Sequence, residues 1–498
     1  MNKAESASAE QKLIDRGWTQ AENAENADLI IINTCSVRAT AETRIHGRLG
    51  WYTALRRENE KSSREHEKSS RESEKMHDAE SEFMQKKSSR EHEKMHDAES
   101  ESIQKKSSRA RNKDFTLIVM GCMAQRLMGD LKKQFPVVDY VVGNFNKKFF
   151  DEIFEAVEKG VHLDSLEETP AYVFDPLSYE KGSFSAYVPI MHGCNNFCTY
   201  CIVPYVRGRE ISRSPSEILA ELDQLNMHGV KEITLLGQNV NSYCWNKVKN
   251  ESNTRSNLTV EEAESKDFIF FPELLHMIAS HLEKTNSSIE WVRFMSSHPK
   301  DLSDDLIKVI AEESRICRHI HLPVQHGSSE ILRRMNRRYS REYYLGLVAK
   351  IRSTIPNVSL TTDIMLGFPG ETEKDFEDTI SLMNEVRYET SFMYYYNPRE
   401  GTPAASYENQ VPLELKKSRL SKIIDLQQEI TKEEMKKQLG RTVKVLVEGI
   451  SHNDDAELIA RTERDESVVF AADKNLIGQF VNVKLETLSG ITFRGTMI

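Results

Sequence analysis

The 498-residue sequence lacks the features that would place it in a membrane or on an export route. No stretch approaches the roughly 20 consecutive apolar residues of a membrane span, and the first residues hold no basic segment followed by an apolar one. A net charge of -10 also fails to attract phosphates, so any RNA contact must depend on local basic patches. We expect a cytoplasmic chain with no membrane contact, built from about three compact units.

Cysteine is scarce, with seven residues in the whole chain. Three of them, Cys194, Cys198 and Cys201, follow the spacing Cys-x-x-x-Cys-x-x-Cys. So few cysteines do not make a disulfide framework, and the crowding favours thiolate ligands kept reduced. Three thiolates on a four-iron cluster leave one iron open to chelate the amino and carboxylate groups of S-adenosylmethionine (SAM). A structural zinc site is the alternative, but it needs a fourth ligand and only His192 stands nearby.

Two other cysteines follow apolar runs that predict buried parallel strands. The run over residues 27–34 leads to Cys35, and the run over residues 115–121 leads to Cys122. Because sites in open α/β sheets gather at the carboxyl ends of the strands, we expect these two thiols to meet at one sheet edge. The α/β domain that holds them is predicted over residues 1–150.

Between these two runs, residues 56–113 are almost free of apolar side chains and repeat themselves, since the seven residues from Met76 recur from Met95. This segment contains 16 Lys and Arg against 14 Asp and Glu. Such a chain cannot bury enough apolar surface to offset its conformational entropy, which predicts a disordered or loosely helical insertion. A second polar stretch, residues 245–266, is predicted to be a surface loop.

Strands and helices alternate from about residue 183 to 426, which predicts a parallel barrel or partial barrel in a domain over residues 180–430. One helix is expected over Ser216–His228. The expected strands are Glu232–Leu236, Trp291–Met295, His319–Leu322 and Ser359–Met365. Beyond Gly440 apolar residues alternate with polar ones, which predicts a small β-barrel over residues 436–498.

The run Gly193–Arg209, which contains the three crowded cysteines, resembles the MiaB-type tRNA methylthiotransferases, a branch of the radical SAM methylthiotransferase family. Further matching motifs are Leu235–Tyr243, Ser297–Pro299, His321–Gln325, Asp363–Thr372 and Asn397–Pro403. The resemblance implies an α/β fold with an N-terminal methylthiotransferase α/β domain, a central radical SAM partial (β/α) barrel and a C-terminal TRAM-like β-barrel that binds RNA.

The resemblance also implies two [4Fe-4S] clusters and SAM as cofactors. It makes Cys194, Cys198 and Cys201 the catalytic cluster ligands, and Cys35 and Cys122 two ligands of an auxiliary cluster.

The remaining cysteines, Cys244 and Cys317, match no ligand motif and are interpreted as structural. The family's first auxiliary ligand lies in a Gly-Cys-Gln-Met-Asn motif, and this sequence opens at Met1 as though inside that motif. We therefore expect the auxiliary cluster to lack one Cys ligand here, with the true start upstream.

The implied activity is methylthiolation of C2 of N6-isopentenyl-adenosine at position 37 of tRNA. Its implied partners are the tRNA anticodon stem-loop and a flavodoxin- or ferredoxin-type reductant protein, and the chain is expected to be a monomer. Two alternatives stay open. One is a methylthiotransferase acting on threonylcarbamoyl-adenosine of tRNA or on a ribosomal-protein aspartate, and the other is a noncatalytic iron-sulfur RNA-binding protein. The triplet Asn195–Phe197 and the run Tyr205–Arg209 favour the isopentenyl branch.

Two motifs outside the cysteine loop have open interpretations. Four arginines in Arg333–Arg338 either contact the tRNA backbone or form a solvated, ion-paired helix face. Gly367, Pro369 and Gly370 predict a tight turn, close to the cofactor or simply after a strand. His326 stands where the family usually shows Ser and is assigned no role.

Overall fold

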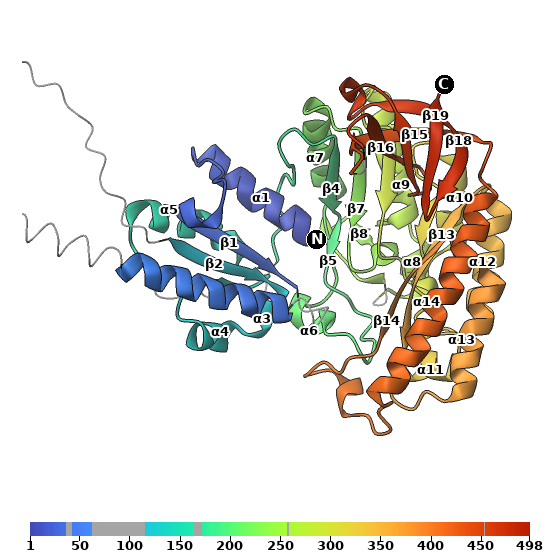
Figure 1. The fold of residues 1–498 in the computed structure, drawn as a ribbon, viewed down its shortest axis with the longest axis horizontal. Helices are drawn as coiled ribbons and strands as arrows, with labels where there is room; N and C mark the ends of the chain where they lie inside the picture. Colours follow the sequence, from blue (N-terminus) through green and yellow to red (C-terminus); the bar gives the residue numbers. More distant parts are fainter. Residues whose placement is uncertain (36–41, 62–114, 164–171, 256–257, 453) are drawn as a thin grey trace, which may run out of the picture. The chain divides into compact units, whose positions relative to one another are not determined.

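The computed structural model describes residues 1–35, 42–61, 115–163, 172–255, 258–452 and 454–498. These residues form two compact units, one made of Gly17–Glu168 and the other of Met1–Arg16 with Thr169–Ile498 (Figure 1). Most of the predicted insertion over 56–113 lies outside the described residues. Its expected start at 56 is too early, because residues 42–61 are helical and Arg56 pairs with Asp139 at 2.7 Å.

The smaller unit is built on a parallel sheet of β1 (Leu29–Thr34), β2 (Thr116–Gly121) and β3 (Tyr140–Val142), in the order β1-β2-β3. Most of β2 is buried, as its apolar run predicts for a strand covered on both faces, whereas burial alternates along β1, where Ile30, Ile32 and Thr34 are the buried residues. Its other described elements are the helix over residues 42–61, η1 (Ala24–Asn26), α3 (Cys122–Arg126), α4 (Met128–Gln134), η2 (Lys147–Phe149) and α5 (Phe150–Lys159).

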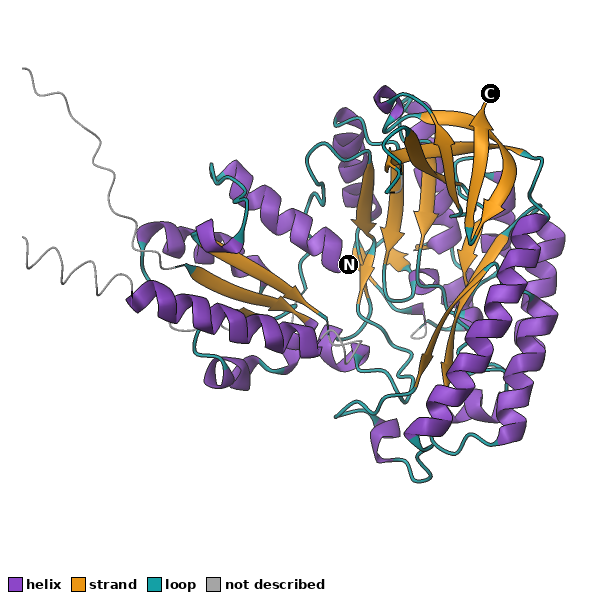
Figure 2. Cartoon of the chain, viewed as in Figure 1, coloured by secondary structure: helices purple, strands orange, loops and turns teal. Residues whose placement is uncertain are grey.

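In the larger unit, six strands form two parallel sheets (Figure 2). One has the order β11-β7-β4 and the other β12-β13-β14, and a parallel bridge from Val292 of β11 to Ile316 leads toward β12. The strands are β4 (Ser185–Pro189), β7 (Glu232–Leu236), β11 (Trp291–Phe294), β12 (His319–His321), β13 (Ser359–Leu366) and β14 (Thr390–Tyr395). The intervening helices are α7 (Pro215–Met227), α9 (Phe271–Lys284), α10 (Asp304–Glu312), α11 (Ser329–Arg334), α12 (Arg341–Thr354) and α13 (Glu373–Val386). The predicted partial (β/α) barrel is confirmed.

Shorter elements decorate this barrel. They are β5 (Met191–His192), α6 (Val203–Arg207), β6 (Ile211–Ser212), η3 (Val240–Ser242), β8 (Cys244–Asn246), β9 (Glu251–Ser252), α8 (Val260–Glu264), β10 (Phe268–Phe270), η5 (Pro299–Asp301) and η6 (Pro403–Ser406). The prediction of a plain surface loop over residues 245–266 is therefore wrong. Strand β8 pairs with both β9 and β10 in a small antiparallel sheet, which gives the backbone groups there partners that sequence polarity does not reveal.

The helix α1 (Asn2–Asp15) belongs to the larger unit and not to the α/β unit, which differs from the expected domain range of 1–150. Glu5 of α1 forms a buried ion pair with Arg207 at 3.0 Å. Lys3 lies over the ring of Tyr187 in β4, with its ammonium 5.6 Å from the ring centre. These contacts attach α1 beside the first barrel strand.

After the barrel, the long helix α14 (Leu413–Lys436) packs beside α13 and leads to a closed barrel of five strands (Figure 1). These are β15 (Thr442–Ile450), β16 (Glu457–Thr462), β17 (Ser467–Ala471), β18 (Phe480–Ser489) and β19 (Thr492–Met497), with η7 (Lys474–Leu476) before β18. Alternating side chains such as Val445 and Val447 fill its core, as the period of two predicts. None of the described helices is long and apolar enough to cross a membrane.

Candidate active site

Cys194, Cys198 and Cys201 lie in one loop that follows the first barrel strand, between β5 and α6. Gly193 opens this loop with a φ of +75°, a region that side chains disfavour. A Cβ at this position would lie 2.0 Å from the carbonyl oxygen of Arg209, so only glycine fits. The amide of Cys194 then donates to the carbonyl of Gly208 at 3.1 Å, which closes the base of the loop.

The three thiols are close enough to repel one another as anions. Burial raises the pKa of Cys194 and of Cys201 to about 12, and the charges of the neighbouring cysteines add to the rise. Bound iron would reverse this, because coordination deprotonates a thiol. Among the described residues, no three Cys, His, Asp or Glu side chains are grouped tightly enough for one metal ion. Three thiolates in one loop suit a four-iron cluster, in which each thiolate binds a different iron.

The turn that follows α11 holds the cysteine loop in place. The amide of Thr199 donates to the carbonyl of Met335 at 3.1 Å, and the hydroxyl of Thr199 donates to the carbonyl of Arg334 at 3.0 Å. The Asn336 side chain donates to the carbonyls of Asn196 at 3.2 Å and Phe197 at 3.0 Å. The arginine-rich run therefore supports the site from inside the molecule.

The four arginines of this run have different surroundings. Arg333 is exposed and pairs with Glu330 at 2.7 Å, which matches the ion-paired helix face weighed from the sequence. Arg337 is only 5% exposed, so it lies inside the protein and not on an RNA-binding face. Sequence reasoning missed this position because a run of arginines carries no sign of which member is buried.

Unsatisfied polar atoms gather beside the loop, past the carboxyl ends of β7 and β11. Asn241 is 2% exposed, and neither atom of its amide has a hydrogen-bond partner among the described residues. Ser297 Oγ and His298 Nε2 are also buried without a hydrogen-bond partner among the described residues. Burial holds the pKa of His298 well below its usual value. Buried polar atoms need partners. A ligand with amino, carboxylate and hydroxyl groups, such as SAM, fits this donor and acceptor set.

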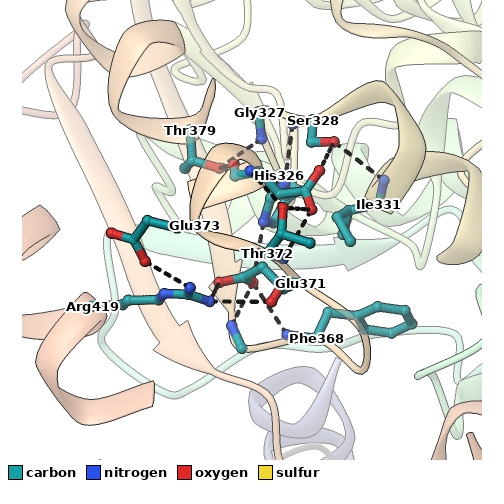
Figure 3. A network of polar contacts seen from close by, with 12 residues as sticks. His326, Gly327, Ser328, Ile331, Phe368, Glu371, Thr372, Glu373, Thr379 and Arg419 are labelled. Atoms are coloured by element: carbon teal, nitrogen blue, oxygen red, sulfur yellow. Dashed lines mark hydrogen bonds and ion pairs between the residues drawn. The ribbon is translucent and has the colours of Figure 1, made fainter. Parts of the chain in front are cut away.

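The predicted tight turn at Gly367–Gly370 is held by a buried carboxylate that the sequence did not reveal (Figure 3). Glu371 accepts hydrogen bonds from the amides of Gly367 at 2.5 Å and Phe368 at 3.2 Å. It also pairs with Arg419 of α14 at 2.7 Å. The turn is thus tied to the long helix.

His326 completes the same network from the other side (Figure 3). Its Nδ1 accepts from the amide of Ser328 at 3.0 Å, so its Nε2 carries the hydrogen and donates to Glu371 at 3.2 Å. The residue that the sequence left without a role is therefore a fully buried structural link between the loops after β12 and β13.

In the smaller unit, the strand register brings Cys35 and Cys122 to the same sheet edge. Thr34, the last residue of β1, pairs with Gly121, the last residue of β2, and each cysteine comes next in the chain. Gly121 has a φ of +97°, and a Cβ there would lie 2.5 Å from the carbonyl oxygen of Thr34. The side chain of Asn144 reaches Cys122 Sγ at 3.8 Å.

Cys244 and Cys317 are both buried in the larger unit, at 0% and 2% exposure. Burial raises the pKa of Cys244 to about 11 and that of Cys317 to about 12. Their interpretation as structural residues stays a prediction.

A cavity of about 1050 Å³ lies elsewhere, lined by Lys231, Trp291, Arg441 and Lys444 among others. It sits at the amino-terminal ends of β7 and β11, whose first residues are Glu232 and Trp291. Sites in parallel barrels form at the carboxyl ends of the strands. We therefore place the chemistry at the cysteine loop and not in this cavity.

The sequence matches known families over much of its length. Residues 188–383 match the Radical SAM superfamily, residues 1–63 match the uncharacterized protein family UPF0004, and residues 436–498 match the TRAM domain. Among solved structures, the radical SAM methyltransferase TsrM from Kitasatospora setae is 15% identical, with a TM-score of 0.45 and 59% of each chain covered.

Curated relatives match from end to end. The tRNA-2-methylthio-N(6)-dimethylallyladenosine synthase of Treponema denticola is 44% identical, covering 100% of this chain and 97% of the relative. Proteins of the same name from Treponema pallidum and Clostridium botulinum are 43% and 40% identical, again over 100% of this chain and 96% and 95% of theirs. The chain therefore belongs to the radical SAM tRNA methylthiotransferase family, whose members use a [4Fe-4S] cluster and SAM.

Proposed function

We propose that this chain transfers a methylthio group to C2 of N6-isopentenyl-adenosine at position 37 of tRNA. The observation that carries the proposal is the loop that holds Cys194, Cys198 and Cys201 after the first barrel strand, in a chain whose relatives are named for this reaction. These three thiolates are the proposed ligands of the cluster that cleaves SAM.

The protein's own residues have distinct tasks in this scheme. The cluster and SAM, when bound, supply a radical able to take hydrogen from an unactivated C–H bond, which acid-base groups cannot do. Asn241, Ser297 and His298 offer buried polar atoms to SAM. The Glu371 network fixes the Gly367 turn at the carboxyl end of β13. The fold thus orients the cofactors and excludes water.

Cys35 and Cys122 are the proposed ligands of an auxiliary cluster that supplies the sulfur. Their support is the shared sheet edge, with the polar side chain of Asn144 against Cys122. A third thiolate ligand of that cluster would have to come from a cysteine other than these two, which directly follow β1 and β2. The proposed domains are an α/β domain within residues 1–150, a barrel domain over 180–430 and a small β-barrel over 436–498, with α1 counted with the barrel because Met1–Arg16 groups with it.

The proposed RNA partner is the anticodon stem-loop, which exposes unpaired bases to aromatic side chains. Tyr205 beside the cysteine loop is 52% exposed, and its ring meets Phe197 edge to face at 6.0 Å. Arg209 covers the same Phe197 ring at 4.4 Å, so this surface combines a stacking face with positive charge. A flavodoxin- or ferredoxin-type protein is the proposed electron donor to the monomeric chain, in the cytoplasm where tRNA is modified.

The test uses the full chain, reconstituted anaerobically with iron and sulfide. Parent protein, Cys201→Ala and Cys35→Ala are given SAM, dithionite and a stem-loop carrying N6-isopentenyl-adenosine, with Cys244→Ala as the matched buried-cysteine control. We expect Cys201→Ala to lose 5'-deoxyadenosine release, and Cys35→Ala to keep it while losing methylthiolation. Cys244→Ala should retain both products, measured by mass spectrometry.

Two results would count against this proposal. If Cys201→Ala releases 5'-deoxyadenosine at the parent rate, the ligand assignment is wrong. If the parent modifies a threonylcarbamoyl-adenosine stem-loop and leaves the isopentenyl one unchanged, the substrate belongs to the other branch of the family.

A further inference from the structure

Arg337 reaches a cluster cysteine from inside the protein. Its Nη1 donates to Cys198 Sγ at 3.4 Å, and its Nη2 donates to the carbonyl of Pro323 at 2.9 Å. Its Nε donates to the hydroxyl of Tyr339 at 2.9 Å, and Tyr339 in turn donates to the carbonyl of Val324 at 2.9 Å. These hydrogen bonds fix the guanidinium in one orientation, in which Nη1 faces the Cys198 sulfur.

This arrangement leaves a buried positive charge in need of an anion. Arg337 is 5% exposed, and among the described residues its hydrogen-bond partners are neutral oxygens and the Cys198 sulfur, with no carboxylate in an ion pair. Burying a cation without a counter-charge is unfavourable, because the charge loses its hydration. A Cys198 thiolate is the group in contact that would supply the missing negative charge.

We propose that Arg337 is a positioning residue that makes the SAM-cleaving cluster easier to reduce, by holding the Cys198 thiolate with an N–H···S hydrogen bond and a fixed positive charge. The proposal rests on the proposed function, because it takes Cys198 as a cluster ligand. Reduction adds one negative charge to the cluster. Hydrogen bonds to the sulfur and a nearby cation both stabilise the more negative state, so they raise the reduction potential.

The same turn allows this effect to be separated from loop folding. Thr199 is held by backbone carbonyls at positions 334 and 335, and the Asn336 side chain holds the carbonyls of Asn196 and Phe197. None of these bonds uses the Arg337 side chain. A change at Arg337 therefore removes the charge, the sulfur bond and the bonds to Tyr200, Tyr339 and Pro323, while the backbone anchors of the loop stay in place.

The experiment compares Arg337→Met and Arg337→Lys with the parent and with Arg333→Met, an exposed arginine of the same run that contacts no cysteine. Each full-length chain is reconstituted anaerobically, its iron and sulfide are counted, and its cluster is titrated with a one-electron chemical reductant followed by electron paramagnetic resonance. At a fixed potential we expect the ratio of reduced to oxidised cluster in Arg337→Met to be about tenfold lower than in the parent. For a one-electron couple this equals a reduction potential lower by about 59 mV. Arg337→Lys should lose less, and Arg333→Met should match the parent.

A second readout is the iron–thiolate stretching frequency of the oxidised cluster by resonance Raman spectroscopy. Loss of the N–H···S bond should shift it in Arg337→Met, whereas a merely structural role for Arg337 would leave it unchanged in any variant that keeps its cluster.

An unchanged potential in whichever Arg337 variant holds a full cluster overturns the proposal. Failure of both variants to take up iron, with Arg333→Met intact, would make Arg337 an assembly requirement and would also overturn the tuning role. A parent chain that binds no cluster, or whose Cys198→Ala variant binds and titrates like the parent, refutes the proposed function instead.

Discussion

Arg293 of β11 and Glu232 of β7 form an ion pair at 2.7 Å, with both side chains less than 5% exposed. The same guanidinium donates to the carbonyls of Thr462 at 2.7 Å and Glu463 at 2.8 Å, in the turn after β16. Arg461 of the TRAM barrel approaches Glu232 from the other side at 2.8 Å. One carboxylate at the start of a barrel strand therefore joins the catalytic and C-terminal barrels.

Replacing Arg293 with Met should therefore weaken this joint. It leaves two TRAM carbonyls without their donor and Glu232 with one cation in place of two, at a cost of about 3–5 kcal/mol. Arg494→Met is the control, because Arg494 pairs with Glu457 at the surface, where water screens the pair, and its loss should cost much less stability. Denaturant unfolding measures both, and equal losses would show that the Arg293 joint adds no stability.

Gly193 and Gly229 offer a matched test of the cysteine loop. Both have positive φ, at +75° and +77°, but a Cβ would strike backbone only at Gly193. We expect Gly229→Ala to cost roughly 1 kcal/mol from backbone strain and to keep its iron. Gly193→Ala should displace Cys194 and lose most of the bound iron. Similar iron contents in the two variants would contradict this account of the loop.

Glu371 and Glu373 both pair with Arg419, one buried and one 58% exposed. Glu371→Gln weakens the acceptor of the Gly367 and Phe368 amides, so hydrogen–deuterium exchange should speed up over residues 366–372. Glu373→Gln removes only the exposed ion pair with Arg419 and should leave hydrogen–deuterium exchange over residues 366–372 unchanged. Should the two variants exchange alike, the carboxylate does not fix the turn.

His319 predicts how stability depends on pH. Burial lowers its pKa to about 4 from an ordinary value of 6.5, so the folded chain keeps it neutral while the unfolded chain protonates it. Its contribution is therefore complete above pH 6.5 and is lost as pH falls toward 4, by up to roughly 3 kcal/mol. Urea midpoints at pH 7 and pH 5 should differ less in His319→Gln than in the parent. A difference between the two midpoints in His319→Gln equal to that of the parent would refute the assignment.

Buried parallel strands could be located from the sequence because they are continuous apolar runs. The expected strand Ser359–Met365 is β13 at Ser359–Leu366, and Glu232–Leu236 is β7 without change. The cysteine spacing likewise placed three thiols in one loop, since residues so near in sequence cannot separate far in space. These features are local, so a local pattern was sufficient.

The supporting groups around the site could not be predicted in this way. Glu371 and Arg419 are far apart in sequence and meet only because α14 packs back onto the barrel. Arg337 is buried by the fold around it, while the other arginines of the same run stay at the surface or half-buried. A buried charge is decided by tertiary packing, to which composition and periodicity give no access.

Strands β1 and β2 are neighbours in one parallel sheet, although the chain between Thr34 and Thr116 is much longer than an ordinary crossover. The entropic cost of closing a connection rises only by about 0.6 kcal/mol for each doubling of its length. Added length therefore takes little stability from the sheet, but it delays the first encounter of the two strands and slows folding. Gain or loss of a copy of the seven-residue repeat is a small fraction of this connection, so it would change the stability of the sheet very little.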